Sequence, residues 1–166
     1  MLAGINMKYN KLSGAIPSEI GLVGNGAGGN FGSILDLSEN SLTGAIPEEF
    51  YDLTTLSSYI DLKSNQLTGT ISTKIGQMTN MQNYMDFSGN DFTGTFPTQV
   101  GLLTDMTGYM DFKSNKLSGV LPAQIGGMTK MNNYLDLSGN KFTGQIPEEL
   151  FDMTKMTHYL DIHNNN

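Results

Sequence analysis

Residues 35–47 read LDLSENSLTGAIP, and close variants of this stretch recur along the chain. The variants are IDLKSNQLTGTIS at 60–72, MDFSGNDFTGTFP at 85–97, MDFKSNKLSGVLP at 110–122 and LDLSGNKFTGQIP at 135–147. A first copy, INMKYNKLSGAIP, occupies 5–17, and a partial copy, LDIHNNN, occupies 160–166. Self-similarity at a fixed period is the signature of a repeat architecture. We therefore expect a single unit over 1–166, with about six repeats of 25 residues and part of a seventh.

Each repeat carries the chemistry of a short strand followed by a tight turn. An aspartate stands between two apolar residues, so a strand would place it on the opposite face from its neighbours. Four residues later an asparagine turns the chain, and its amide can bond the backbone of adjacent coils. We assign this structural role to the recurring asparagines Asn40, Asn65, Asn90, Asn115 and Asn140.

The rest of the repeat returns the chain to the next strand. The glycine of the Thr-Gly step allows a tight bend, and the following proline breaks any helix. One coil is too small to bury its own apolar face, but stacked coils share a continuous core. The pattern predicts an α/β repeat solenoid, a curved right-handed coil. Its concave face would carry a parallel β-sheet, and its convex face short 3-10, helical or irregular segments.

The repeated pattern LxLxxNxLxGxIP resembles the plant-type leucine-rich repeat of receptor-like kinase ectodomains and polygalacturonase-inhibiting proteins. The resemblance covers nearly the whole chain. It implies a binding module whose concave face contacts a partner. Three features depart from the family pattern: the period is 25 rather than 24 residues, the cysteines of the caps are missing, and methionine often replaces leucine. Because exposed solenoid ends need polar caps, we expect the segment to belong to a longer protein.

Composition limits the classes of function. The net charge is −7 and no basic cluster is present, which argues against nucleic acid and anionic membrane surfaces and suits a neutral or cationic partner. The chain has no cysteine, so thiolate metal sites and disulfides are absent. No apolar run is long enough for a membrane span. Catalytic motifs are missing, and the two histidines, His158 and His163, both lie near residue 166. We expect neither an enzyme nor a cofactor or metal site.

The outward strand positions form the candidate ligand-binding surface on the concave face. Tyrosine offers a large contact area with a polar tip, and from Asp61 onward a tyrosine precedes each recurring aspartate by two residues. The alternative is that the tyrosines only cover the edge of the sheet, and that the aspartates of the repeated LDLS motif have a structural role without a bound ligand. Neighbouring carboxylates would repel, which lysines, a cationic ligand or calcium could offset. The candidate residues are Tyr59, Tyr84, Tyr109, Tyr134, Asp61, Asp86, Asp111, Asp136, Lys63 and Lys113. The two lysines alternate with Ser38, Ser88 and Ser138 in successive coils.

Two other features invite a functional interpretation. Hydroxyl residues before each Thr-Gly or Ser-Gly glycine form a column, and regular threonine arrays occur in some ice-binding solenoids. The second threonine is present at Thr70 and Thr95 but is replaced at Ala45, Val120 and Gln145, so the array is interrupted. A Gly-rich insertion at 21–32 includes a GxGxxG match, which we interpret as a surface loop because a repeat strand follows it at once.

These observations lead to a non-catalytic module that binds a protein or peptide, with a glycan as a further possibility. It would come from a receptor-like or secreted protein. The alternatives are a scaffold or accessory subunit docked in a larger assembly and, as a minor one, an ice-binding solenoid. The resemblance implies the cell exterior. The lack of cysteine and of Asn-x-Ser/Thr sequons leaves an organellar or cytosolic location open.

Overall fold

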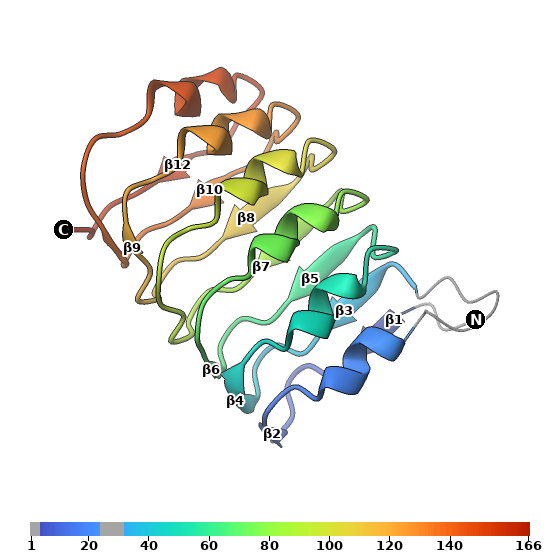
Figure 1. Ribbon diagram of the computed structural model, residues 1–166. Coiled ribbons are helices and arrows are strands. Elements are labelled where there is room, and N and C mark those ends of the chain that lie inside the picture. Colours follow the sequence, from blue (N-terminus) through green and yellow to red (C-terminus); the bar gives the residue numbers. More distant parts are fainter. Residues whose placement is uncertain (1–3, 24–31) are drawn as a thin grey trace.

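The computed structural model describes residues 4–23 and 32–166, and it is a solenoid of stacked coils (Figure 1). Each coil passes through a strand of one common sheet, a turn along the flank and a short helix on the opposite side. The predicted architecture is thereby confirmed. Within the described residues no helix is long and apolar enough to cross a membrane.

The common sheet has seven parallel strands in the order β1-β3-β5-β7-β8-β10-β12. Its register matches equivalent residues of successive coils, so Asp61 pairs with Asp86 and Asp86 with Asp111. A repeat of 25 residues therefore places equivalent strand positions side by side, so that aspartate meets aspartate from Asp36 onward and tyrosine meets tyrosine from Tyr59 onward. The strands are β1 Gly4–Asn6, β3 Ile34–Asp36, β5 Tyr59–Asp61, β7 Tyr84–Asp86, β8 Tyr109–Asp111, β10 Leu135–Asp136 and β12 Leu160–Asp161.

The opposite side carries one five-residue 3-10 helix per complete coil. Pro47, with φ −66° and ψ 149°, holds extended backbone ahead of η2, and its carbonyl accepts a hydrogen bond from the Phe50 amide. The proline thus sets where the helix begins, and the return to the sheet leaves room for little more than one turn. The helices are η1 Ser18–Leu22, η2 Glu48–Asp52, η3 Thr73–Gln77, η4 Thr98–Leu102, η5 Ala123–Gly127 and η6 Glu148–Asp152.

Short parallel strands also pair along the flank of the solenoid. One group is β2-β4-β6 and another is β9-β11, and isolated bridges join Thr70 to Thr93 and Thr95 to Ser118. The Thr-Gly glycines have φ between 77° and 86° at Gly44, Gly69, Gly94, Gly119 and Gly144, the left-handed region that favours glycine. The flank strands are β2 Ser13–Gly14, β4 Ser41–Ala45, β6 Gln66–Thr68, β9 Ser118–Gly119 and β11 Lys141–Phe142.

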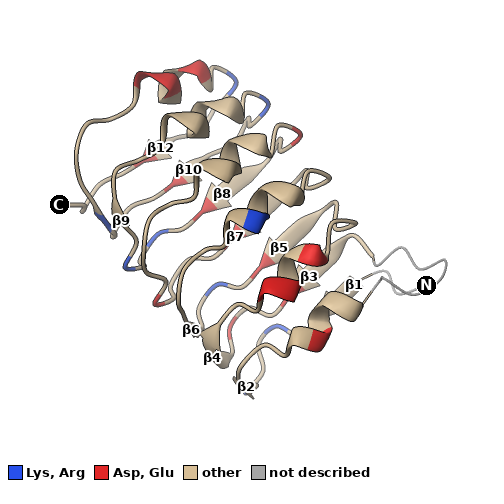
Figure 2. Cartoon of the chain, viewed as in Figure 1, with Lys and Arg blue, Asp and Glu red and all other residues tan. Residues whose placement is uncertain are grey.

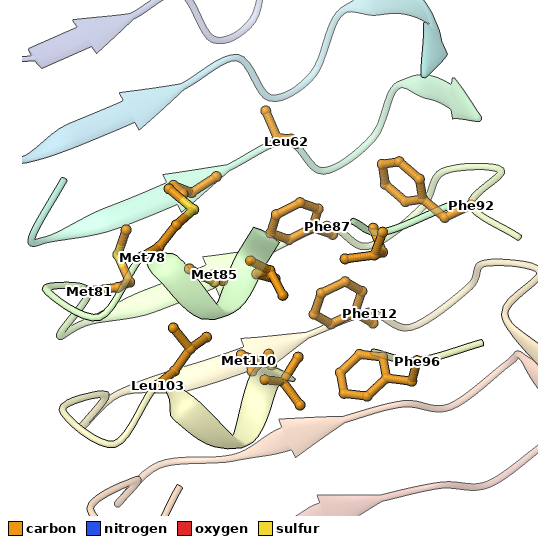
Figure 3. Close-up of a cluster of buried hydrophobic side chains, with 14 of the residues drawn as sticks. Leu62, Met78, Met81, Met85, Phe87, Phe92, Phe96, Leu103, Met110 and Phe112 are labelled. Atoms are coloured by element: carbon orange, nitrogen blue, oxygen red, sulfur yellow. The ribbon is translucent and has the colours of Figure 1, made fainter. Parts of the chain in front are cut away.

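The core is one apolar column that runs the length of the solenoid. Phe87 and Phe112, from adjacent coils, stack with ring centroids 4.9 Å apart, and Phe96 meets Phe112 edge to face (Figure 3). The methionines that replace leucine belong to this core: Met78, Met81, Met128 and Met131 are fully buried. Because its side chain is flexible, methionine can fill irregular gaps between the side chains of adjacent coils.

The recurring asparagines tie successive coils together. Asn90 donates from its side-chain nitrogen to carbonyl oxygens of Leu62, Phe87 and Ser88 at 3.0–3.2 Å. Its Oδ1 accepts from the Leu67 amide of the preceding coil at 3.0 Å. The same pattern recurs at Asn65, Asn115 and Asn140.

The predicted insertion at 21–32 is described only at its edges. Gly21 and Leu22 close η1, and residues 24–31, with the glycines Gly24, Gly26 and Gly29, lie outside the described part of the chain. The interpretation of that stretch as a surface loop stays a prediction.

Candidate functional site on the sheet face

The outward face of the sheet carries a continuous stack of tyrosine rings, which we call the tyrosine ladder. Adjacent rings have centroids 4.5–4.8 Å apart and planes within 6–13° of parallel. This spacing equals the distance between parallel strands, so the in-register sheet itself creates the stack. Its members are Tyr59, Tyr84, Tyr109, Tyr134 and Tyr159.

The ladder presents ring edges and hydroxyl groups to solvent. Tyr59 at one end and the three inner members are partly exposed, and Tyr159 at the other end is 47% exposed. Burial, and then the carboxylate of Asp61, raises the pKa of Tyr84; burial and Asp86 do the same for Tyr109. The hydroxyls are therefore protonated at neutral pH and can donate as well as accept hydrogen bonds.

The aspartates form an acid row beside the ladder, but almost none of their surface is accessible. Asp36, Asp61, Asp86, Asp111 and Asp136 are only 2–6% exposed. Each carboxylate accepts a hydrogen bond at 2.9–3.2 Å from the backbone amide two residues later. In alternate coils a serine hydroxyl also donates to it at 2.6–2.7 Å. The acid row thus stabilises the turn after each strand. A ligand on this face would contact the more exposed tyrosines and lysines before it reached the aspartates.

The position two residues after each aspartate, just past the end of the strand, alternates between lysine and serine. Lys63 Nζ lies 3.6 Å from Asp61 Oδ2 and 3.9 Å from Asp86 Oδ2, so one ammonium forms ion pairs with two carboxylates. Lys8 Nζ lies 3.9 Å from Asp36 Oδ2 in the same way. Figure 2 shows acidic residues in the strands and basic residues in the turns that follow them. We call Lys8, Lys63 and Lys113 the lysine row.

Lys8 is the member of this row that the sequence analysis overlooked. The first repeat has Asn6 in place of the aspartate and an insertion after it, which obscured its alignment with the others. Pairing of Asn6 with Asp36 in the sheet places Lys8 two residues beyond, as Lys63 is from Asp61. A signal was present, since Lys8 stands two residues after the strand centre in INMKYN.

Two carboxyl groups of the acid row have shifted acidity. Burial raises the pKa of Asp61 to about 6, with the neighbouring Asp86 adding to the rise, and burial raises that of Asp111 to about 6. Asp161 in β12 differs, because hydrogen bonds from the His163 backbone and side chain lower its pKa. Burial is thus the main cause of both shifts, and repulsion from neighbouring carboxylates adds to it.

A second regular surface runs along the flank, and we call it the threonine ribbon. Its first column is Ser13, Thr43, Thr68, Thr93, Ser118 and Thr143; its second is Ala15, Ala45, Thr70, Thr95, Val120 and Gln145. All twelve side chains are uncharged, and all are at least partly exposed. A methyl group at Gly94 would approach Thr70 Cγ2 to 2.8 Å, so the side chain of one coil packs on the glycine of the next. The two columns therefore stack from coil to coil, and the Asp91–Lys116 ion pair at 2.7 Å lies two residues before the first column.

The described residues hold no group of three or more carboxylate or histidine side chains arranged for a metal ion. His158 and His163 are both exposed in the last coil, where His158 Nδ1 contacts the Thr157 hydroxyl and His163 Nδ1 contacts Asp161.

Comparison with known proteins agrees with this geometry. The leucine-rich-repeat family model matches residues 33–53 and 133–153. The two matched segments are leucine-rich repeats, and the other repeats share their pattern, which is similar to that of the plant receptor structures. A search of curated proteins gave no match to this leucine-rich-repeat chain.

Several solved structures share the leucine-rich-repeat fold along the chain. The Arabidopsis receptor kinase HAESA, in complex with the peptide hormone IDA and the co-receptor SERK1, superposes with a TM-score of 0.84 at 22% identity, over 99% of this chain and 30% of that one. A TDR receptor gives 0.78 at 28% identity, over 99% and 31%. A plant ice-binding protein gives 0.81 at 25% identity, over 98% and 49%. The chain thus spans 30–49% of the length of these proteins.

Proposed function

We propose that this chain is a recognition module that binds a protein or peptide across its sheet face. The tyrosine ladder is the observation that carries the proposal. Five aligned rings with accessible edges offer contact area that is already ordered, so binding them costs little side-chain entropy. A purely structural strand edge has no need of a polar tip in five successive coils.

The similar proteins support the same class of function. HAESA is described in complex with a peptide hormone, and a further neighbour is a plant peptide hormone receptor, RGFR1, in complex with RGF2. This resemblance supports the proposal that the chain belongs to an extracellular or membrane-anchored, non-catalytic protein. A scaffold docked through its helical side would leave the ladder unused, which separates the two proposals.

A peptide display selection tests the recognition proposal without assuming the ligand. We expect selected peptides to bind the native chain and to lose at least about tenfold in affinity when Tyr84, Tyr109 and Tyr134 are changed to alanine. The matched control changes Thr68, Thr93 and Thr143 to alanine on the flank, and should bind normally. Circular dichroism and urea denaturation establish that both variants are folded. Peptides that bind the tyrosine variant equally well would place recognition elsewhere.

We propose ice binding as a second candidate function, which the threonine ribbon favours. The ribbon is uncharged and repeats from coil to coil through paired flank residues, and the similar plant ice-binding protein covers nearly the whole chain. Rigid hydroxyl and methyl groups at fixed intervals are suited to an ordered layer of water.

An ice-recrystallisation assay distinguishes the second candidate from the first. A bulky charge at the centre of the ribbon, Thr93→Lys, should abolish any inhibition of crystal growth, whereas Tyr109→Ala on the sheet face should leave it intact. Lack of inhibition by the native chain would remove this candidate and leave the recognition proposal untouched.

A further inference from the structure

In the coils that form the tyrosine ladder, the exposed charged or titratable groups beside it are Lys63 and Lys113, with His163 and the 31% exposed Asp161 carboxylate in the last coil. Lys8 continues the lysine row two coils before Tyr59. The Lys8 and Lys63 side chains are 47% and 35% exposed, and Lys113 is exposed as well. The intervening serines Ser38 and Ser88 are 2% and 7% exposed. Because the lysines occupy alternate coils, and strands are about 4.8 Å apart, the lysine row repeats at about 10 Å.

The charges around this row disfavour a strongly charged ligand of either sign. An anion at Lys63 would approach the two carboxylates that already lie within 4 Å of its ammonium. A cation would approach the ammonium itself, because the acid row is covered. Each ammonium has three donors, however, and the tyrosine hydroxyls add further donors. The complementary partner is therefore uncharged and rich in hydrogen-bond acceptors.

A polyproline II segment has these properties. Its backbone makes no internal hydrogen bonds, and proline has no N–H, so the chain offers carbonyl acceptors with few competing donors. It has three residues per turn and a rise of about 3.1 Å, so equivalent carbonyls recur about every 9 Å. That interval is close to two coils of the solenoid. Aromatic surfaces are also the usual docking sites for this conformation.

We propose that the tyrosine ladder and the lysine row together bind a proline-rich segment in the polyproline II conformation. The segment lies along the solenoid axis, across the strands, with one turn for every two coils. Proline rings pack against the tyrosine edges, and one backbone carbonyl per turn accepts a hydrogen bond from a lysine. This inference rests on the proposed recognition function and specifies its ligand.

Two synthetic peptides of equal length test the conformation. We expect labelled (Ala-Pro-Pro)4 to bind the native chain in a fluorescence anisotropy titration, and (Ala-Gly-Gly)4 to bind at least about tenfold more weakly. Because the ligand is uncharged, the Kd for the first peptide should change less than about twofold between 50 and 500 mM salt. Equal binding of both peptides, or absence of binding to the first, would overturn the proposal.

Two lysine variants test the register. Lys63→Met with Lys113→Met keeps the length of the side chains but removes the donors, and should weaken (Ala-Pro-Pro)4 by about tenfold. The matched control is Lys116→Met with Lys130→Met, whose partners Asp91 and Asp105 lie outside the sheet face. Urea denaturation checks that both double variants are folded. Equal affinity of the two would contradict the role of the lysine row.

The peptide display selection distinguishes failure of the polyproline II inference from failure of the proposed recognition function. If display selection yields peptides that need the tyrosines but contain no proline, the sheet face still recognises peptides and only the polyproline inference fails. If no selected peptide depends on the tyrosines, both fail.

Discussion

At the scale of single residues, the asparagines do more for this fold than their small size suggests. One amide satisfies backbone groups in two coils, inside a turn that water cannot reach. A buried backbone group left without a partner costs about 1–3 kcal/mol, so every coil depends on this side chain.

Asn90→Ala tests this dependence. The variant leaves the Leu67 amide without its Oδ1 acceptor and removes one of the two amide donors to the Leu62 carbonyl, which keeps its bond from Asn65. We therefore expect a loss of about 1–3 kcal/mol in the free energy of unfolding. Asn80→Ala is the control, since Asn80 is exposed and makes one bond, to the Thr54 carbonyl at 2.8 Å. Urea denaturation followed by circular dichroism measures both. A loss below 1 kcal/mol for Asn90→Ala would show that water replaces the amide.

At the scale of elements, the packing of adjacent 3-10 helices depends on one small residue per coil. A methyl group on Gly101 of η4 would lie 2.1 Å from the Gln124 carbonyl oxygen of η5, and one on Gly126 would meet the Glu149 carbonyl at the same distance. In η2 the equivalent residue is Tyr51, which is fully buried and accepts a hydrogen bond from the Ser72 amide. The neighbouring helix there packs on a ring instead of on backbone.

Gly101→Ala should therefore force η4 and η5 apart. We expect it to destabilise the fold by about 1–3 kcal/mol, the usual range for overpacking. Gln77→Ala, at an exposed position of η3, should change stability by no more than about 0.5 kcal/mol. Thermal unfolding of the two variants measures this difference. Equal unfolding midpoints would mean that η4 and η5 can move apart without loss of stability.

The strand register could be predicted from the sequence, whereas the burial of the aspartates could not. The strand register could be predicted because aspartate recurs every 25 residues, and the sheet pairs these aspartates directly. The burial of the acid row could not be predicted, because it depends on side chains of adjacent coils and not on the alternation within one strand. The alternation correctly assigns Asp61 to the outward face, but it cannot show that the carboxylate is covered.

At the scale of the whole molecule, the acid row makes stability depend on pH. The pKa of Asp61 and of Asp111 is about 6 in the folded state, above the usual 3.8 of a free carboxyl group. The folded chain therefore binds more protons than the unfolded chain between about pH 4 and pH 6. The contribution is favourable at low pH and is lost as pH rises through about 6.

We expect the free energy of unfolding to increase by at least about 1 kcal/mol between pH 7.5 and pH 5, because a shift of one pKa unit corresponds to about 1.4 kcal/mol. Asp61→Asn with Asp111→Asn should flatten this dependence. Urea titrations at four pH values, for the native chain and the double variant, provide the measurement. Lower stability at pH 5 than at pH 7.5 in the native chain would contradict the assignment.

The stacked tyrosines also give the molecule an optical probe of its own. The chain has seven tyrosines and no tryptophan, and five of the seven belong to the ladder. Its ultraviolet emission and near-ultraviolet dichroism consequently come mostly from the surface proposed to meet the partner. A molecule that settles there should alter both signals without any attached dye, whereas one that settles on the helical side should leave them almost unchanged.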